Sequence, residues 1–215
     1  MPIDLYDCLD SPPCLAVRLT LQYLKISFNL RNTNIEASEH LTPEFLKLNP
    51  AHIIPTINDN GFVLWESRTI NRYLANQYSP DTDLYPNDPQ KRAIVDRMLD
   101  FDLGSLFPSA FDWMLAPIFE QKPRDEEKEK AMSEKLQLLD HFLSEAGYVA
   151  GDHLTIADFS VLASVISIYS AGHNMDQYKN INSWLNRLEN ELPFYKQSID
   201  PYVEACDVWF ASYKK

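Results

Sequence analysis

The chain is poor in cysteine and has no long hydrophobic run. Its 215 residues include three cysteines, Cys8, Cys14 and Cys206, and so sparse and odd a number does not form a disulfide framework. The N-terminal MPIDLYDCLD has no basic segment ahead of an apolar stretch, and no later segment approaches the roughly 18 uncharged apolar residues of a membrane span. We therefore expect a cytoplasmic protein without a targeting signal or a membrane anchor.

Basic residues are also scarce relative to acidic ones. Lys and Arg number 19 and Asp and Glu 31, which gives a formal charge of −12. Because the acidic residues are spread along the chain, nucleic acid and anionic membrane surfaces are poor candidate partners. The 45% hydrophobic and 23% charged residues are ordinary globular proportions, and the length allows one large domain or two small ones.

The first 78 residues alternate between strand and helix patterns. Short apolar segments predict strands at 3–6, 28–30, 56–57 and 62–65, and helices are expected after Ser11-Pro12, after Thr42-Pro43 and from Ser67 as its N-cap. Asn58-Asp59-Asn60-Gly61 lies between the last two strands and indicates a hairpin. The order β-α-β-α-β-β-α predicts a small α/β domain over residues 1–78.

The remainder of the chain shows helical patterns. Residues 79–89 contain three prolines and three aspartates and are expected to be a linker, followed by an all-helical domain over 90–215. Thr155-Ile156-Ala157-Asp158 has the form of a capping box, and the helix that it starts is apolar almost all round. Another helix is predicted by an amphipathic stripe of Met132, Leu136, Leu139 and Leu143, with Gly147 as its C′ residue. Two further helices are predicted around residues 184–191 and 202–213.

The turn Asp10-Ser11-Pro12-Pro13-Cys14 joins the first strand to the first helix. A helix N-terminus stabilises an anion through unpaired N–H groups and a partial positive charge. The Ser11 hydroxyl could accept a bond from the helix while donating its proton outward, which suits a bound thiolate. The alternative is that Ser11 is only an N-cap.

Two further turns could bind parts of a peptide. In the segment from His52 to Pro55, a cis Ile54-Pro55 bond would turn the Ile54 backbone toward an extended ligand, whereas a trans proline would only mark a strand start. His40 and His52 could donate to a carboxylate or be ordinary surface residues.

The third turn is Trp65-Glu66-Ser67-Arg68. Ser67 at a helix N-terminus suits a carboxylate and Glu66 a neighbouring primary amine, and an amino acid α-carbon carries both groups. The alternatives are a cap at Ser67, a first-turn charge at Glu66 and a solvated surface charge at Arg68.

Five segments, in this order along residues 3–195, resemble the cytosolic glutathione transferases, specifically the arthropod delta and epsilon classes. These segments are SPPC, EHLTPEFLKLNPAHIIPT, GFVLWESRTINRYL, LYPNDPQKRAIVD and YVAGDHLTIADFS. The resemblance implies a thioredoxin-like N-terminal domain, an all-helical C-terminal domain and a homodimer. It also implies glutathione as co-substrate, with no further cofactor and no metal.

Residue roles follow from the same resemblance. It implies that Ser11 donates to the glutathione thiolate and that Glu66 and Ser67 bind the γ-glutamyl amine and carboxylate, with Arg68 nearby. The remaining glutathione-binding positions that it implies are His40 and His52 at the glycyl end, and Ile54, before a cis Pro55, at the cysteinyl backbone.

Two other side chains near the first turn, those of Cys14 and Tyr6, are alternative candidates for the nucleophile or the hydrogen-bond donor. Thiol-reducing relatives carry a cysteine where Ser11 stands, so serine favours transfer of glutathione over deglutathionylation. Cys14 lies one helical turn further in and is expected in the core, and Tyr6, inside the first strand, is expected to pack.

The resemblance implies an apolar second substrate, such as an aryl halide or an enal, and thus a role in detoxification. Its expected contacts are Pro13, Ile35, Leu103, Phe107, Phe111, Leu115, Phe119 and Phe210. The helical members of this set could equally be plain core, and Asp112 departs from the basic residue expected of epsilon members. A non-catalytic carrier of hydrophobic ligands and a glutathione-dependent dehydrochlorinase or isomerase are the alternative functions.

Overall fold

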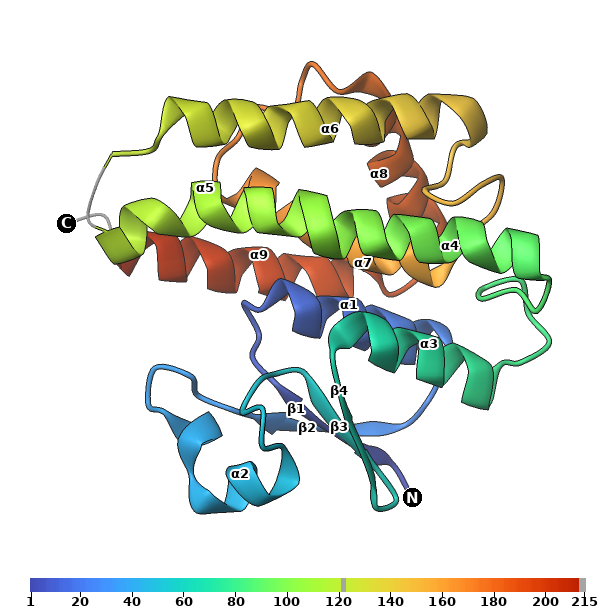
Figure 1. The fold of residues 1–215 in the computed structure, drawn as a ribbon, viewed down its shortest axis with the longest axis vertical. Helices are drawn as coiled ribbons and strands as arrows, with labels where there is room; N and C mark the ends of the chain where they lie inside the picture. Colours follow the sequence, from blue (N-terminus) through green and yellow to red (C-terminus); the bar gives the residue numbers. More distant parts are fainter. Residues whose placement is uncertain (121–122, 213–215) are drawn as a thin grey trace.

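The first 78 residues form a four-stranded sheet with helices packed on it, which confirms the predicted thioredoxin-like domain (Figure 1). The computed structural model describes residues 1–120 and 123–212. The strands are ordered β2-β1-β3-β4, with β1 parallel to β2 and the other pairs antiparallel. The elements are β1 (Ile3–Asp7), α1 (Pro12–Tyr23), β2 (Phe28–Asn32), η1 (Glu39–Leu41), α2 (Pro43–Leu48), β3 (Thr56–Asp59), β4 (Phe62–Trp65) and α3 (Ser67–Tyr78).

The register of the sheet brings four chain segments to one of its edges. Thr56, at the start of β3, pairs with Tyr6 near the end of β1 and with Trp65 at the end of β4. On the other side of β1, Asp7 pairs with Asn32 at the end of β2. The loops that follow β1, β2 and β4 and the loop that precedes β3 therefore leave the sheet together.

The β3–β4 hairpin turn is tighter than its four-residue signal suggests. Strand β3 extends two residues further than predicted, to Asp59, whereas β4 has its predicted bounds, so that only Asn60 and Gly61 remain between them, with φ of 52° and 98°. Positive φ at both positions is what a two-residue turn of this twist requires, and Asn-Gly supplies it at low cost.

The rest of the described chain is helical, as predicted. Its helices are α4 (Pro89–Phe101), the π-helical turn η2 (Asp102–Leu106), α5 (Phe107–Glu120), α6 (Glu126–Ala146), α7 (Ile156–Ser170), α8 (Lys179–Glu191) and α9 (Tyr195–Ser212). Residues 156–168 of α7 are buried on every side, which places this helix at the centre of the helical core. None of the described helices is both long and apolar enough to cross a membrane.

The capping box of α7 is confirmed and has a wider role. The buried Asp158 carboxylate accepts bonds from Thr155 N at 2.8 Å, Val149 N at 3.0 Å and Trp184 Nε1 at 3.0 Å. Burial raises the pKa of Asp158, and these donors act in the opposite direction by stabilising its charged form. One aspartate therefore joins the start of α7 to α8 and to the loop before α7.

Two helices begin earlier than the sequence pattern indicates. Helix α8 starts at Lys179 rather than near Trp184, and α9 starts at Tyr195 rather than near Tyr202. In α9 the signal is interrupted by Pro201, which lies inside the helix although proline is unfavourable there. Tyr213, the expected end of the last helix, lies outside the described residues.

The two parts of the chain pack closely through α1, α3 and α7 (Figure 1). Helix α3 ends at Tyr78 and α4 begins at Pro89, and we propose residues 79–89 as the boundary between a domain of residues 1–78 and one of residues 90–215. This segment is not loose, because Leu84 and Tyr85 are buried in the helical core and Leu84 O accepts a bond from Ile156 N at 3.0 Å.

Candidate active site

Ser11 lies at the N-cap of α1, just beyond the sheet edge described above. Its hydroxyl makes no capping bond within the described chain, contrary to the expectation that it accepts from the helix. Pro12 and Pro13 have no N–H, and Leu15 N already donates to Ser11 O at 2.9 Å. The first turn of α1 therefore offers an incoming anion the Ser11 hydroxyl, the Cys14 amide and the helix dipole.

The cysteines near this turn are not competing nucleophiles. Cys14 is fully buried, as predicted, and burial raises the pKa of its thiol, although a hydrogen bond with the Ser11 side chain acts the other way. Burial and the neighbouring Asp10, to which Cys8 Sγ donates at 2.8 Å, raise the pKa of Cys8 to about 12. Both thiols are therefore protonated near neutral pH.

Tyr6 takes the packing role expected of it. Its ring lies edge-on to Phe45 of α2, with the ring centroids 5.6 Å apart. This contact helps to fix α2 against the sheet.

His40 and His52 lie close together at the same edge, with their ring centroids 6.2 Å apart. His40 Nδ1 is buried and has no hydrogen-bond partner among the described residues. His52 is exposed and has a φ of 46°, which turns the chain just before β3. A buried ring nitrogen without a partner is costly unless a ligand completes it.

The Ile54-Pro55 peptide bond is cis. Neither backbone group of Ile54 bonds to another residue in the described part of the chain. Asn49, which the sequence marks only as the end of a helix, is fully buried and donates to Ile53 O at 3.0 Å and Thr56 Oγ1 at 2.9 Å. Asn49 therefore fixes the residues on both sides of the Ile54-Pro55 bond.

The start of α3 differs from the prediction by one residue. Glu66, not Ser67, is the N-cap, and its φ of 71° is unusual for a residue other than glycine. Ile70 N makes the first helical bond, to Glu66 O at 2.8 Å, so the amides of Ser67, Arg68 and Thr69 precede the hydrogen-bonded helix. Ser67 is buried, while Glu66 is exposed beside it.

Arg68 is a buried residue and not the solvated charge that one alternative predicts. It is 7% exposed, and its guanidinium bonds to Asp102 Oδ2 through Nη2 at 2.5 Å and Nε at 3.1 Å. A third donor, Nη1, reaches Ser67 Oγ at 3.2 Å. Asp102 lies in the π-helical turn η2 and also accepts from Ser164 Oγ of α7 at 2.6 Å.

Asp102 is a residue that sequence reasoning missed. No feature near Asp102 in the sequence points to Arg68, which lies 34 positions away. In addition, the π-helical turn shifts the helical spacing that would otherwise indicate which side chains face inward. Through Arg68 it links the helical domain to the turn that begins α3.

The predicted substrate contacts divide into exposed and packed positions. Leu103 and Phe111 are 46% and 45% exposed, and Ile35 and Pro13 are partly exposed, so none of these is core. Phe107 lies under Arg68, whose guanidinium carbon is 5.2 Å from the ring centroid. Leu115 and Phe210 are half-buried against the helical core, and the side chain of Phe119 lies outside the described residues.

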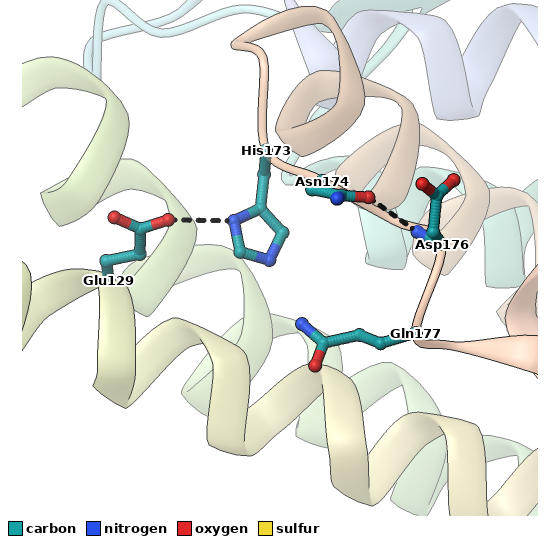
Figure 2. Close-up of a pocket in the computed structure, with 5 residues that line it drawn as sticks. All are labelled: Glu129, His173, Asn174, Asp176 and Gln177. Carbon is teal, nitrogen blue, oxygen red and sulfur yellow. Dashed lines mark hydrogen bonds and ion pairs between the residues drawn. The ribbon is translucent and has the colours of Figure 1, made fainter.

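A separate cavity of about 550 Å³ lies between the start of α6 and the loop from α7 to α8. Figure 2 shows the Glu129 carboxylate facing the ring of His173, with Asp176 and Gln177 on the opposite wall. Glu129 Oε1 is 3.1 Å from His173 Nδ1. The carboxylates of Glu129 and Asp176 would repel a ligand that carries two carboxylates. This cavity therefore differs from the site at the sheet edge.

Comparison with known proteins agrees with this geometry. The model of the glutathione S-transferase N-terminal domain matches residues 1–76, and the model of the C-terminal domain of the same family matches residues 105–191. The chain belongs to the glutathione S-transferase family. With these domains and the close structural matches below, it is a transferase that uses glutathione.

Several solved insect structures are similar to this glutathione transferase over nearly its whole length. A delta-class enzyme from Nilaparvata lugens is 42% identical with a TM-score of 0.96, covering 99% of this chain and 100% of its own. A Bombyx mori enzyme is 40% identical with a TM-score of 0.92, at 99% and 98% coverage. An epsilon-class enzyme from Musca domestica is 35% identical with a TM-score of 0.91, again at 99% and 98%. The resemblance to the delta and epsilon classes is thereby confirmed.

Proposed function

We propose that this glutathione transferase conjugates the glutathione thiolate to small hydrophobic electrophiles and that Ser11 stabilises the thiolate. The observation that supports this role most directly is the uncapped Ser11 hydroxyl at the start of a helix whose next two residues are prolines. Because two of the usual amide donors are missing, the hydroxyl becomes a principal donor to a sulfur bound there. A thiol with a pKa of about 8.5 needs such help to ionise near neutral pH.

The remaining loops at the sheet edge would bind the peptide. Glu66 would pair with the γ-glutamyl ammonium group, while the Ser67 hydroxyl and the amides at the start of α3 would bind the adjacent carboxylate. Arg68 would act through Ser67, to which it donates, rather than by direct contact. The Ile54 backbone next to the cis Pro55 would pair with the cysteinyl unit.

The glycyl carboxylate would be bound by His40 and His52. The unpartnered Nδ1 of His40 supports this assignment. Because the chain carries a formal charge of −12, a ligand with two carboxylates requires local positive potential, and two helix N-termini with these histidines would provide it.

In the reaction that we propose, the thiol proton leaves to solvent and the thiolate attacks the electrophilic carbon. An aryl halide then loses halide as its carbon–halogen bond breaks, whereas an enal becomes an enolate that takes a proton from solvent. The protein would contribute ionisation and positioning. The electrophile would contact a set of apolar side chains, namely Pro13, Ile35, Leu103, Phe107, Phe111, Leu115, Phe119 and Phe210. Phe107 would lie between the glutathione site and the electrophile site, because it packs against Arg68, which contacts Ser67.

We further propose a cytoplasmic homodimer. Exposed apolar side chains outside the proposed substrate site support a self-association surface, notably Phe62 on β4 and Ile94 on α4. Light scattering after size-exclusion chromatography would test the dimer, and a monomeric mass of 24.9 kDa would contradict it.

The experiment that tests the role of Ser11 is a pH-rate profile of Ser11→Ala with an aryl halide. We expect lower turnover and a kinetic pKa about one unit higher, because a charge-assisted hydrogen bond to the thiolate is lost. Ser183→Ala, which removes an exposed hydroxyl of α8, is the matched control and leaves the profile unchanged. An unchanged profile in the Ser11 variant would exclude the proposed role.

The same assay separates the alternative functions. A carrier would bind hydrophobic dyes and glutathione but show negligible turnover. An elimination or isomerisation would use the same thiolate as a base, and its products would contain no carbon–sulfur bond to glutathione.

A further inference from the structure

Arg18 of α1 is a buried cation in a helix whose other buried side chains are mostly apolar. It is 6% exposed, and the nearby Leu15 and Leu19, in the helical core, and Val17, in the core of the sheet domain, are fully buried. Its Nη1 bonds to both carboxylate oxygens of Asp7, at 2.8 Å and 2.6 Å. Burying an ion pair costs free energy that hydrophobic residues of the same size would not, so its presence here calls for a specific role.

The guanidinium also bonds to the loop that leads into Ser11. Arg18 Nη2 donates to Leu9 O at 2.9 Å and Nη1 to Cys8 O at 3.3 Å. Cys8 O also accepts from Ser11 N at 3.2 Å. Arg18 therefore fixes the loop between β1 and α1 from the interior of the domain.

The next carbonyl of the same loop is contacted from the helical domain. Cys206 Sγ of α9 lies 3.9 Å from Asp10 O, within range of a weak thiol donor. The Cys206 thiol is itself hydrogen-bonded to Tyr202, whose hydroxyl is 2.7 Å from Ser167 Oγ of α7. Helices α1 and α9 contact one another, so this bond spans the two domains (Figure 1).

We propose that Arg18 is a positioning residue for the Ser11 hydroxyl, assisted by Cys206, an inference that rests on the proposed function. The three carbonyls of Cys8, Leu9 and Asp10 are the last backbone acceptors before Ser11, and each has a donor from α1 or α9. Because Asp7 neutralises the Arg18 charge, the electrostatic field of the pair does not stabilise the thiolate directly. The pair acts instead by fixing the position of the loop and of the Ser11 hydroxyl.

A planar guanidinium is needed for this task. Its donors lie in a fixed fork that reaches a carboxylate and two carbonyls at once, whereas an ammonium group is a single point charge on a flexible stem. Arg18→Lys therefore preserves the charge that faces Asp7 but loses the orientation of the loop.

The test measures the pKa of the bound glutathione thiol from its ultraviolet thiolate absorbance, together with the pH dependence of kcat/KM. We expect Arg18→Lys to raise this pKa by about half a unit and to lower kcat/KM about threefold below it. Cys206→Ala should give a smaller shift in the same direction, and Cys206→Ser, which restores a donor, should return the pKa toward that of the unmodified protein. Arg72→Lys, which alters an arginine paired with Asp96 away from this loop, is the control and leaves the pKa unchanged.

A purely structural role predicts another result. If Arg18→Lys and Cys206→Ala lower the melting temperature but leave the thiol pKa unchanged, the inference is wrong. If Arg18→Lys does not fold, the thiol pKa values of Cys206→Ala and Cys206→Ser decide whether the inference holds. Ser11→Ala, measured alongside, separates failure of this inference from failure of the proposed function. If the thiol pKa shifts in Ser11→Ala but not in the Arg18 and Cys206 variants, only this inference is rejected. If the thiol pKa shifts in none of the variants, the proposed role of Ser11 is rejected as well.

Discussion

The turns before α1 and before α3 have the same local pattern, a strand followed by serine at a helix start, yet they present different chemistry. At α1, two prolines remove amide donors, and the Ser11 hydroxyl makes no capping bond within the described residues. At α3, the amides of residues 67–69 precede the first helical bond, and the Ser67 hydroxyl is buried beneath Arg68. A single directed donor suits a sulfur atom, whereas several converging N–H groups suit a carboxylate.

The two turns also differ in what stabilises them. The α1 turn is fixed mainly within its own domain, by Arg18 and Asp7. The α3 turn depends on Asp102 of the helical domain. Substitutions on either side should therefore separate thiol ionisation from peptide binding, and the following variants test that separation.

The largest effect is expected for Asp102→Ala. It leaves the Arg68 guanidinium buried without its carboxylate, which should lower the free energy of unfolding by about 3–5 kcal/mol. Asp100→Ala is the matched control, because Asp100 is largely exposed and should change stability by no more than about 0.5 kcal/mol. Urea denaturation measures both, and equal losses would contradict an anchoring role for Asp102.

Asp59 anchors the other half of α3 and should affect stability alone. It accepts from Tyr73 at 2.7 Å, Tyr78 at 2.6 Å and Asn60 at 2.7 Å, and these bonds lower its pKa. A depressed carboxyl pKa stabilises the fold above the unfolded value near 4, and this contribution is lost as the pH falls.

The corresponding variant is Asp59→Asn. It should lower the free energy of unfolding by about 1–2 kcal/mol at pH 7, and the difference from the unmodified protein should shrink below about pH 4. Glutathione affinity should not change. A constant difference from pH 7 to pH 3 would contradict the assignment of the effect to the Asp59 charge.

Glu66→Gln should change binding and not ionisation. Losing the charge-assisted bond to the γ-glutamyl ammonium should raise the dissociation constant of glutathione about tenfold. The pKa of the bound thiol should stay the same, since Ser11 is untouched. Calorimetric titration with glutathione measures the dissociation constant. The control is Glu44→Gln, which removes an exposed acid of α2 and therefore reports any general effect of losing a negative charge.

The smallest expected effect is that of Pro13→Ala. It restores an amide donor in the first turn of α1, which should lower the pKa of the bound thiol by a few tenths of a unit. Pro89→Ala, at the first position of α4, makes the same change away from the site. A raised thiol pKa in the Pro13 variant would show that the prolines themselves help to orient Ser11.

Much of the fold and part of the site are visible in the sequence because they depend on near neighbours. The order of strands and helices and the Thr155–Asp158 capping box are local features, and the structure confirms both. It also confirms the hairpin but shortens its turn from the predicted four residues to Asn60 and Gly61. The two interpretations of Ser67 and Arg68 as a simple cap and a surface charge are wrong, because the helix begins one residue earlier and a distant aspartate buries the arginine.

The sequence by itself determined the α/β order, the helical second half and the three turns whose residue types suit a thiolate, an amine and carboxylates. Only the tertiary structure decided that these turns meet at one sheet edge, through the pairing of Thr56 with Tyr6 and Trp65. It also decided which charges are buried in pairs, Arg18 with Asp7 and Arg68 with Asp102. The physical reason is that propensity and capping act over a few residues, whereas an ion pair is defined by the burial of both partners, which packing alone brings together.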